Sequence, residues 1–98
     1  MKQNYYVYII SNYGRTVFYI GVTNDLSRRV YEHKNGLIEG FSKKYKLKHL
    51  VYFEQGSSAY ESISREKQLK NWHRQWKINL IKQTNPDMKD LDAEINSA

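Results

Sequence analysis

Residues 5–29 read YYVYIISNYGRTVFYIGVTNDLSRR, and this stretch decides how the first part of the chain folds. Two runs rich in aromatic and β-branched residues, 5–11 and 17–22, predict two β-strands. The segment NYGR (12–15) between them contains turn-forming residues and predicts a hairpin. We therefore expect two neighbouring antiparallel strands that both carry tyrosines.

The rest of the sequence predicts further helices and one more strand, bounded by capping and turn residues. In chain order we expect a helix capped by residues 23–25 and ending near 35, a loop over 36–48, a strand over 49–54, a helix from 57 or 58 to about 71, and a helix from about 73 to 82. The order β-β-α-β-α-α predicts an α+β fold, with helices packed on an antiparallel or mixed three-stranded sheet. Residues 1–86 should form one domain, and residues 87–98 a weakly ordered acidic tail.

The composition excludes several classes of site. The chain has 98 residues and no cysteine, so it has neither a disulfide framework nor a thiolate metal site. No apolar stretch approaches the length of a signal-peptide core or a membrane span. We expect a cytoplasmic protein that makes no contact with a membrane.

Charge is distributed unevenly along the chain. Residues 1–86 contain 15 Lys and Arg against 6 Asp and Glu, whereas residues 87–98 contain 1 against 4. A folded part with a net charge of +9 attracts polyanions, of which nucleic acid is the commonest large one. Basic small domains without any nucleic-acid role are also common, so charge alone leaves both possibilities open.

Tyrosines from both predicted strands should meet on one face of the hairpin. A symmetric turn centred on Tyr13 and Gly14 places Tyr8 directly opposite Tyr19, with Cβ atoms about 5 Å apart. Gly21 then lies on the same face and leaves space beside the tyrosines. The pair could equally be an aromatic contact that only stabilises the sheet, and a one-residue bulge would change this register.

The helix after the hairpin carries two arginines that point in different directions. Leu26 and Val30 define its buried side. At 100° per residue, Arg29 lies about 60° and His33 about 20° from Leu26, whereas Arg28 lies about 160° away. Arg29 should therefore reach over the sheet, while Arg28 faces solvent.

A carboxylate occupies the inward side of the helix over residues 58–71. If Ile63 and Leu69 are buried, Glu66 lies about 60° from each. An inward carboxylate is uncommon unless it is paired or binds a cation. The alternative is an ordinary salt bridge to Lys70, which would contribute about 0.3–0.5 kcal/mol.

Together these side chains match the needs of phosphodiester hydrolysis. A hard cation such as Mg²⁺ requires at least one carboxylate and accepts water at its other positions. Arginine offers phosphate a permanent and bidentate positive charge. A phenol can hold or deprotonate the attacking water when nearby cations lower its pKa from about 10. The three histidines lack the spacing of zinc ligands.

At these residues the sequence resembles the GIY-YIG nuclease superfamily, and in particular its small stand-alone bacterial members. The similar segments are YVY (6–8) and YIG (19–21) for the two name motifs, RRVYEH (28–33) for the arginine-bearing helix, SREKQLKNW (64–72) for the glutamate-bearing helix, and NP (85–86) with DL (90–91) for the late asparagine motif. Tyr6 replaces the glycine of the first motif, which removes no catalytic side chain. Met88 stands where such relatives tend to have tryptophan.

The resemblance implies an antiparallel three-stranded sheet and hydrolysis by direct attack of water, with one Mg²⁺ or Mn²⁺ ion. It implies that Tyr8 orients or deprotonates the water with support from Tyr19, that Arg29 binds the scissile phosphate, and that Glu66 holds the metal. Asn85 would fix the site by hydrogen bonding. The complete implied set of catalytic residues is Tyr8, Tyr19, Arg29, His33, Glu66 and Asn85.

We therefore expect a metal-dependent endonuclease whose action on DNA depends on structure or damage rather than on base sequence. The cations expected to contact nucleic acid are Arg28, Lys43, Lys44, Lys46 and Lys70. The lysines of the 36–48 loop could also serve solubility alone. The alternative function is a non-catalytic nucleic-acid-binding module with the same fold. A protein-interaction domain would leave the basic surface unexplained.

Overall fold

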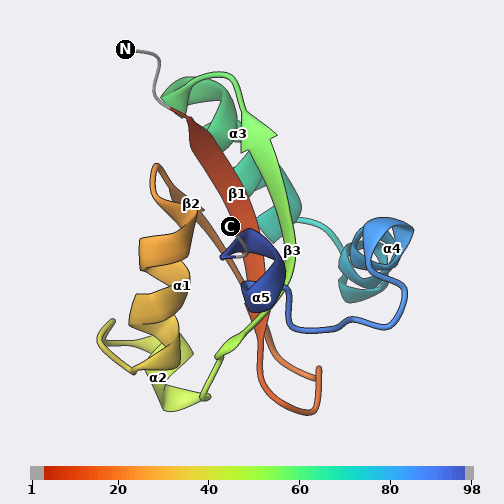
Figure 1. Ribbon diagram of the computed structural model, residues 1–98. Coiled ribbons are helices and arrows are strands. Elements are labelled where there is room, and N and C mark those ends of the chain that lie inside the picture. Colours follow the sequence, from red (N-terminus) through yellow and green to blue (C-terminus); the bar gives the residue numbers. More distant parts are fainter. Residues whose placement is uncertain (1–3, 97–98) are drawn as a thin grey trace.

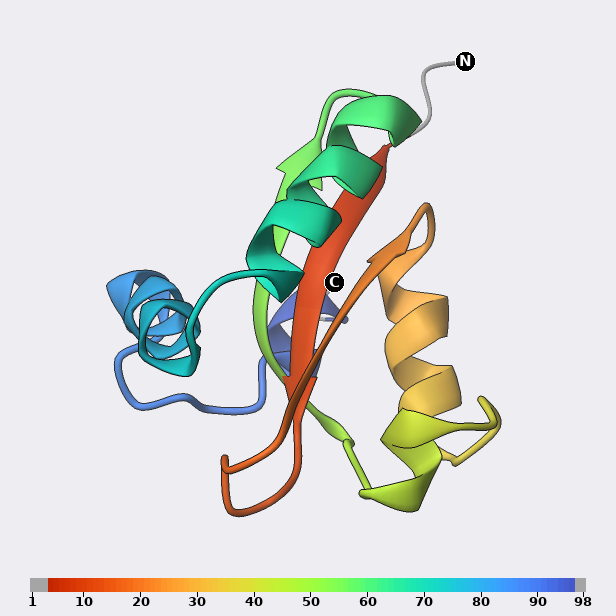
Figure 2. The same ribbon diagram turned by 180° about the vertical axis from the view of Figure 1, so that it is seen from behind.

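A computed structural model of the chain describes residues 4–96, with a three-stranded sheet between helices (Figures 1 and 2). The strand order is β2-β1-β3, and both pairings are antiparallel. The elements are β1 (Tyr5–Ser11), β2 (Phe18–Thr23), α1 (Leu26–Lys34), α2 (Phe41–Lys44), β3 (His49–Gly56), α3 (Ala59–Lys70), α4 (Arg74–Thr84) and α5 (Asp92–Ile95). The predicted α+β fold is confirmed, with α2 and α5 as two short additional helices.

The hairpin has a different register from the predicted one. Tyr8 pairs with Gly21 rather than with Tyr19, and Tyr19 pairs with Ile10. The cause is a longer loop, because Asn12 Oδ1 accepts hydrogen bonds from the backbone N–H groups of Thr16 (2.9 Å) and the next residue (3.1 Å). The shift is two residues, so Tyr8 and Tyr19 still share one face of the sheet.

The two faces of the sheet bury separate clusters. One consists of Val7, Ile9 and Ile20 with Leu69 of α3 and Ile81 of α4. The other contains Tyr8, Ile10 and Leu50 from the strands, Leu26 and Val30 from α1, and Leu47. Figure 2 shows α3 lying along one face, while Figure 1 shows α1 and α5 on the other.

The buried side of α3 is not the one predicted from Ile63, which is 44% exposed. Ser62 and Leu69 instead face the sheet, with 1% and 0% exposed. Ser62 can approach because Gly56 has no side chain: a Cβ there would lie 3.3 Å from Ser62 Cβ and even closer to its hydroxyl. Glu66 lies about 40° from Ser62 on the helical wheel, so it still borders the buried side.

The segment predicted as a loop over residues 36–48 contains α2 and is anchored by apolar contacts. Leu47 is fully buried in the second cluster, and the ring of Phe41 stacks on Tyr19 with centroids 6.5 Å apart. The loop carrying the lysines is therefore attached to the same face of the sheet as Tyr8 and Tyr19.

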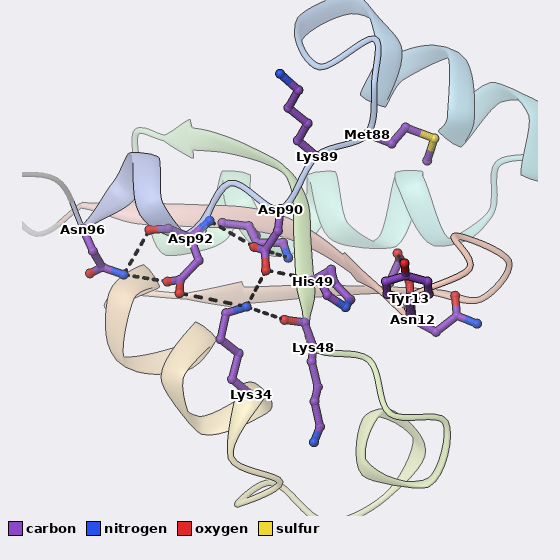
Figure 3. A network of polar contacts seen from close by, with 12 residues as sticks. Asn12, Tyr13, Lys34, Lys48, His49, Met88, Lys89, Asp90, Asp92 and Asn96 are labelled. Carbon is purple, nitrogen blue, oxygen red and sulfur yellow. Dashed lines mark hydrogen bonds and ion pairs between the residues drawn. The ribbon is translucent and has the colours of Figure 1, made fainter.

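Residues 87–96, predicted as a weakly ordered tail, pack against the domain (Figure 3). Asp90 contacts Lys34 of α1 (2.5 Å) and His49 of β3 (3.2 Å), and it accepts a hydrogen bond from the backbone N–H of Leu50 (3.3 Å). Leu91 N–H donates to Leu50 O at 2.7 Å. Residues 97–98 lie outside the described part. Within residues 4–96, no helix has the length and apolar character needed to cross a membrane.

Candidate active site

Aromatic side chains from β1, β2 and α1 meet in one cluster. The ring centroids of Tyr8 and Tyr19 are 6.5 Å apart, and the imidazole of His33 lies 5.6 Å from Tyr8 and 5.9 Å from Tyr19. Tyr8 is 1% exposed and His33 4% exposed, whereas Tyr19 is partly exposed. The cluster therefore has a buried polar interior that opens toward solvent at Tyr19.

Gly21 makes room for the phenol of Tyr8. A Cβ added to Gly21 would lie 2.5 Å from Tyr8 Cζ and 2.8 Å from Tyr8 Cε1, which real Cβ atoms do not tolerate. The ring of Tyr8 thus lies directly over the backbone of its partner strand. The glycine of the YIG motif is required here by space, as the sequence predicts.

A chain of hydrogen bonds links three elements through His33. The Tyr8 hydroxyl lies 3.0 Å from His33 Nε2, and His33 Nδ1 lies 3.0 Å from Ser42 Oγ on α2. All three residues are buried. When Nδ1 carries the single proton of the neutral ring, it donates to Ser42 and leaves Nε2 to accept the Tyr8 proton.

Charges around the cluster act on both titratable groups. Burial raises the pKa of the Tyr8 phenol well above its ordinary value, and the neighbouring Tyr19 adds to this. The charge of Arg29 and its hydrogen bonding lower this pKa, as the sequence analysis expected of a nearby cation, but burial outweighs them. Burial, with the positive charge of Arg29, lowers the pKa of His33 to about 4. Near neutral pH both side chains are therefore uncharged.

Arg29 stands at the exposed edge of this cluster. Its side chain is 40% exposed and forms an ion pair with Glu32 at 3.4 Å. Arg28 is 75% exposed and contacts Glu32 from the outer side of the helix, also at 3.4 Å. The helical wheel therefore assigned the two arginines to the correct sides of α1.

Glu66 and Lys70 reach the cluster from α3, on the opposite face of the sheet. Lys70 Nζ lies 5.7 Å from the ring centroid of Tyr19, and the charge of Glu66 contributes to the raised pKa of Tyr8. Both can pass the sheet because β2 is its edge strand. Glu66 is 20% exposed and pairs with Lys70 at 3.6 Å, so the predicted salt bridge is present beside the cluster.

The donor set fits a weakly held hard cation better than a closed metal site. Among residues 4–96, no group of three or more His, Asp or Glu side chains could hold a metal ion. Mg²⁺ and Mn²⁺ are often held by one or two carboxylates, with water and substrate phosphate oxygens completing the shell. Glu66 supplies one such carboxylate, close enough to Tyr8 for its charge to raise the pKa of the phenol.

Other predicted site residues lie apart from the cluster. Asn85 is buried, but it donates to the backbone carbonyls of Val51 (3.0 Å) and Lys89 (2.9 Å) and accepts from Lys89 N–H (3.1 Å). These contacts attach the turn after α4 to β3 and do not reach the tyrosines. The lysines at positions 43, 44 and 46 are exposed, and Lys43 pairs with Glu39 at 2.9 Å.

Ser42 and Phe41 are site residues that the sequence analysis missed. Both belong to α2, a four-residue helix in a segment interpreted as a polar loop. The signal available was the pair of apolar residues Phe41 and Leu47 that flank the lysines, since a solvated loop has no need of them.

Comparison with known proteins agrees with this geometry. The family described as the GIY-YIG catalytic domain matches residues 4–79. The chain belongs to the GIY-YIG family. Two relatives from Staphylococcus aureus strains Mu3 and USA300, both named UPF0213 protein, are each 32% identical to this GIY-YIG chain over 80 residues. The matched residues cover 82% of this chain and 96% of each relative.

The fold also matches a solved structure. The solution NMR structure of the UPF0213 protein BH0048 from Bacillus halodurans has a TM-score of 0.57 and 24% sequence identity, covering 92% of this chain and 95% of that one. At this identity the likeness establishes the fold. The GIY-YIG family is a nuclease family whose members generally use divalent metals and act on nucleic acid.

Proposed function

We propose that this chain is an endonuclease that hydrolyses DNA phosphodiester bonds with the help of Mg²⁺ or Mn²⁺. One observation carries the proposal: the rings of Tyr8, Tyr19 and His33 are in contact, and the charges of Arg29 from α1 and Glu66 from α3 both act on Tyr8. A fold that only binds nucleic acid would not need a buried phenol and imidazole together with an inward carboxylate.

In the proposed reaction Tyr8 holds the attacking water through its hydroxyl oxygen. As the water oxygen bonds to phosphorus, Tyr8 takes a water proton and passes its own proton to His33 Nε2, 3.0 Å away. The bond from phosphorus to the leaving oxygen breaks, and that oxygen takes a proton from solvent. Ser42 keeps the imidazole oriented through Nδ1.

Arg29 and Glu66 supply the electrostatic part. The guanidinium of Arg29 binds the scissile phosphate with two parallel N–H groups, which lysine cannot reproduce. Glu66 would hold Mg²⁺ or Mn²⁺, which neutralises charge on the phosphate when bound. We assign structure- or damage-directed action because cations around the site contact phosphates, which position DNA without reading sequence.

The test is cleavage of flaps, forks, junctions, nicked duplexes and single strands in Mg²⁺, in Mn²⁺ and in EDTA. Glu66→Gln should lower cleavage by at least about 10²-fold and leave DNA affinity equal or higher, while Glu61→Gln on the exposed side of α3 should retain activity. Arg29→Lys should lower cleavage about 10²-fold, and Arg28→Lys much less. Full activity of Glu66→Gln, or undiminished cleavage in EDTA, would contradict the proposal.

A second candidate is a non-catalytic nucleic-acid-binding module. It is favoured by the Glu66–Lys70 ion pair at 3.6 Å, which accounts for the inward carboxylate without any metal. Binding without cleavage of every substrate in both ions would support this module over the enzyme.

A further inference from the structure

A pocket that shares no lining residue with the tyrosine cluster lies along α4. Its volume is about 210 Å³, and it is lined by Trp72, Trp76, Asn79, Leu80 and Gln83. Drug-sized ligands usually occupy about 300–1,000 Å³, and a cavity of about 150 Å³ holds benzene. The pocket therefore has room for one planar ring system rather than for a larger molecule.

The walls of this pocket are largely aromatic and pack against the core of the domain. The rings of Trp72 and Trp76 are 5.9 Å apart at an angle of 83°, and His73 contacts Trp76 with centroids 5.3 Å apart. Trp72 and Leu80 pack against the buried cluster of the α3 face, whereas Trp76 is 55% exposed. One indole thus presents a flat accessible surface on a fixed support.

Two primary amides stand at the same pocket. Asn79 Oδ1 accepts a hydrogen bond from Gln75 at 2.9 Å, which leaves the Asn79 amide N–H groups available as donors. The Gln83 amide makes no hydrogen bond within residues 4–96. Asparagine and glutamine amides match the paired donor and acceptor groups on base edges.

The surrounding charge suits a polyanion. Residues 67–84 contain five Lys and Arg and no Asp or Glu. Lys70 at the end of α3 and Arg74 at the start of α4 lie over the rings of Tyr19 (5.7 Å) and Phe18 (5.3 Å) on β2. In sequence, these two cations lie between Glu66 of the candidate active site and Trp76 of the pocket.

We infer that this pocket binds one unpaired nucleobase of the nucleic acid that the active site engages. Stacking of bases on aromatic side chains beside a cationic track is how proteins bind single strands without sequence preference. The inference rests on the proposed function only for the choice of nucleic acid as ligand. It names the substrate class as nucleic acid with unpaired bases near the scissile phosphate.

A protein partner is the rival occupant, since tryptophan and arginine are also enriched at protein interfaces. A polyanion is favoured because residues 67–84, which supply every lining residue of the pocket, contain five Lys and Arg and no Asp or Glu. The acidic segment of a second copy is a poor candidate, because Asp90 and Asp92 already pair with Lys34 within their own chain.

The experiment uses fluorescence, because Trp72 and Trp76 are the only tryptophans in the chain. The full chain is titrated in EDTA with single-stranded oligothymidylate, with an abasic deoxyribose-phosphate oligomer of equal length, and with a blunt duplex. We expect quenching of tryptophan emission by oligothymidylate alone. Its affinity should exceed that of the abasic oligomer by about 5- to 160-fold, the range that corresponds to stacking of a single base.

Matched variants separate stacking from charge and from loss of fold. Trp76→Ala should remove the preference for oligothymidylate, and Trp76→Phe should restore part of it. Tyr60→Ala, which removes an aromatic ring 81% exposed at the start of α3, should keep the preference. Equal affinity for both oligomers, or a native preference in Trp76→Ala, would overturn the inference and leave a protein partner as the occupant.

Cleavage reports separately on the proposed function. Stacking in EDTA without cleavage in Mg²⁺ or Mn²⁺ would support the base pocket and count against the enzyme. If fully paired duplex is cleaved as fast as single-stranded substrates and no stacking is seen, the result would support the enzyme and count against the base pocket.

Discussion

The two faces of the sheet are built from alternate residues of the same strand, yet they bury different chemistry. On the face covered by α3, Val7 and Ile9 pack on Leu69 and form a cluster without catalytic groups. On the face covered by α1, Tyr8 contacts His33, and the buried polar atoms bond to one another. Both faces bury apolar residues, but only the α1 face also buries the candidate chemistry. We call the α1 face the polar face and the α3 face the packing face.

This difference shows how little freedom β1 has. Because side chains alternate along a strand, a slip of one residue would move the side chains of the packing face to the polar face and those of the polar face to the packing face. The actual register differs from the predicted one by two residues, and therefore the chemistry stays on its face. Because β2 is an edge strand, Glu66 and Lys70 of α3 can reach around it to the tyrosines of the polar face.

Gly21→Ala has the largest expected effect on the polar face. Its Cβ would lie 2.5 Å from Tyr8 Cζ, and the buried Tyr8 ring, bonded to His33, cannot move aside cheaply. We expect the free energy of unfolding to fall by about 1–3 kcal/mol, as for overpacked cores. Cleavage should fall about 10²-fold, because the phenol moves. Urea denaturation and a cleavage assay measure both.

Gly14→Ala is the matched control, because the nearest atom to its added Cβ is 3.9 Å away. It should change stability by less than about 0.5 kcal/mol. A Gly21→Ala protein as stable and as active as Gly14→Ala would show that the polar face tolerates repacking.

The strands and the caps were predictable because their signals are local. Aromatic and β-branched runs define β1 and β2, and Asp25 and Ser58 accept the first-turn N–H groups of α1 and α3. The helical wheel assigned Arg29 and His33 correctly, because α1 is amphipathic with a single buried side.

The remaining errors concern side-chain contacts within turns and between elements, which hydrophobic patterns do not reveal. The hairpin loop depends on the side chain of Asn12, and Ser62 replaces Ile63 at the sheet because of Gly56, six residues earlier. Residues 87–96 are held by Lys34 and Leu50, which no local pattern in an acidic segment reveals. The association of Ser42 with His33 likewise depends on how α2 docks.

The pH dependence of stability tests the burial of His33, which lies on the polar face. Its pKa is about 4 in the folded protein and about 6.5 when unfolded. Between these values the unfolded chain binds a proton that the native protein does not, so stability is full above pH 6.5 and falls toward pH 4. The loss is at most about 3 kcal/mol.

Urea midpoints measured from pH 7 to pH 4 provide the check. His33→Gln should flatten this dependence, whereas His73→Gln on the exposed surface should keep it. Asp90, whose pKa is lowered by hydrogen bonds that outweigh its burial, loses its stabilising charge only below about pH 3.8. If urea midpoints change equally with pH in His33→Gln and in the native protein, burial of the imidazole does not contribute to the pH dependence of stability.

The smallest expected effects come from two buried serines, one on each face. Ser42 Oγ bonds to His33 Nδ1 at 3.0 Å, whereas Ser62 Oγ has no hydrogen-bond partner among residues 4–96. Ser42→Ala leaves a buried ring nitrogen unpaired and should cost about 1–2 kcal/mol, while Ser62→Ala removes an unsatisfied hydroxyl and should be neutral or slightly stabilising. Only Ser42→Ala should also lower cleavage, by about tenfold, and shift its pH profile, because the imidazole that takes the Tyr8 proton loses its orientation. Ser42→Cys, which keeps a weak hydrogen-bonding group, should recover part of both losses. Equal effects of the two alanine substitutions on stability and cleavage would contradict the proposed difference between the packing face and the polar face.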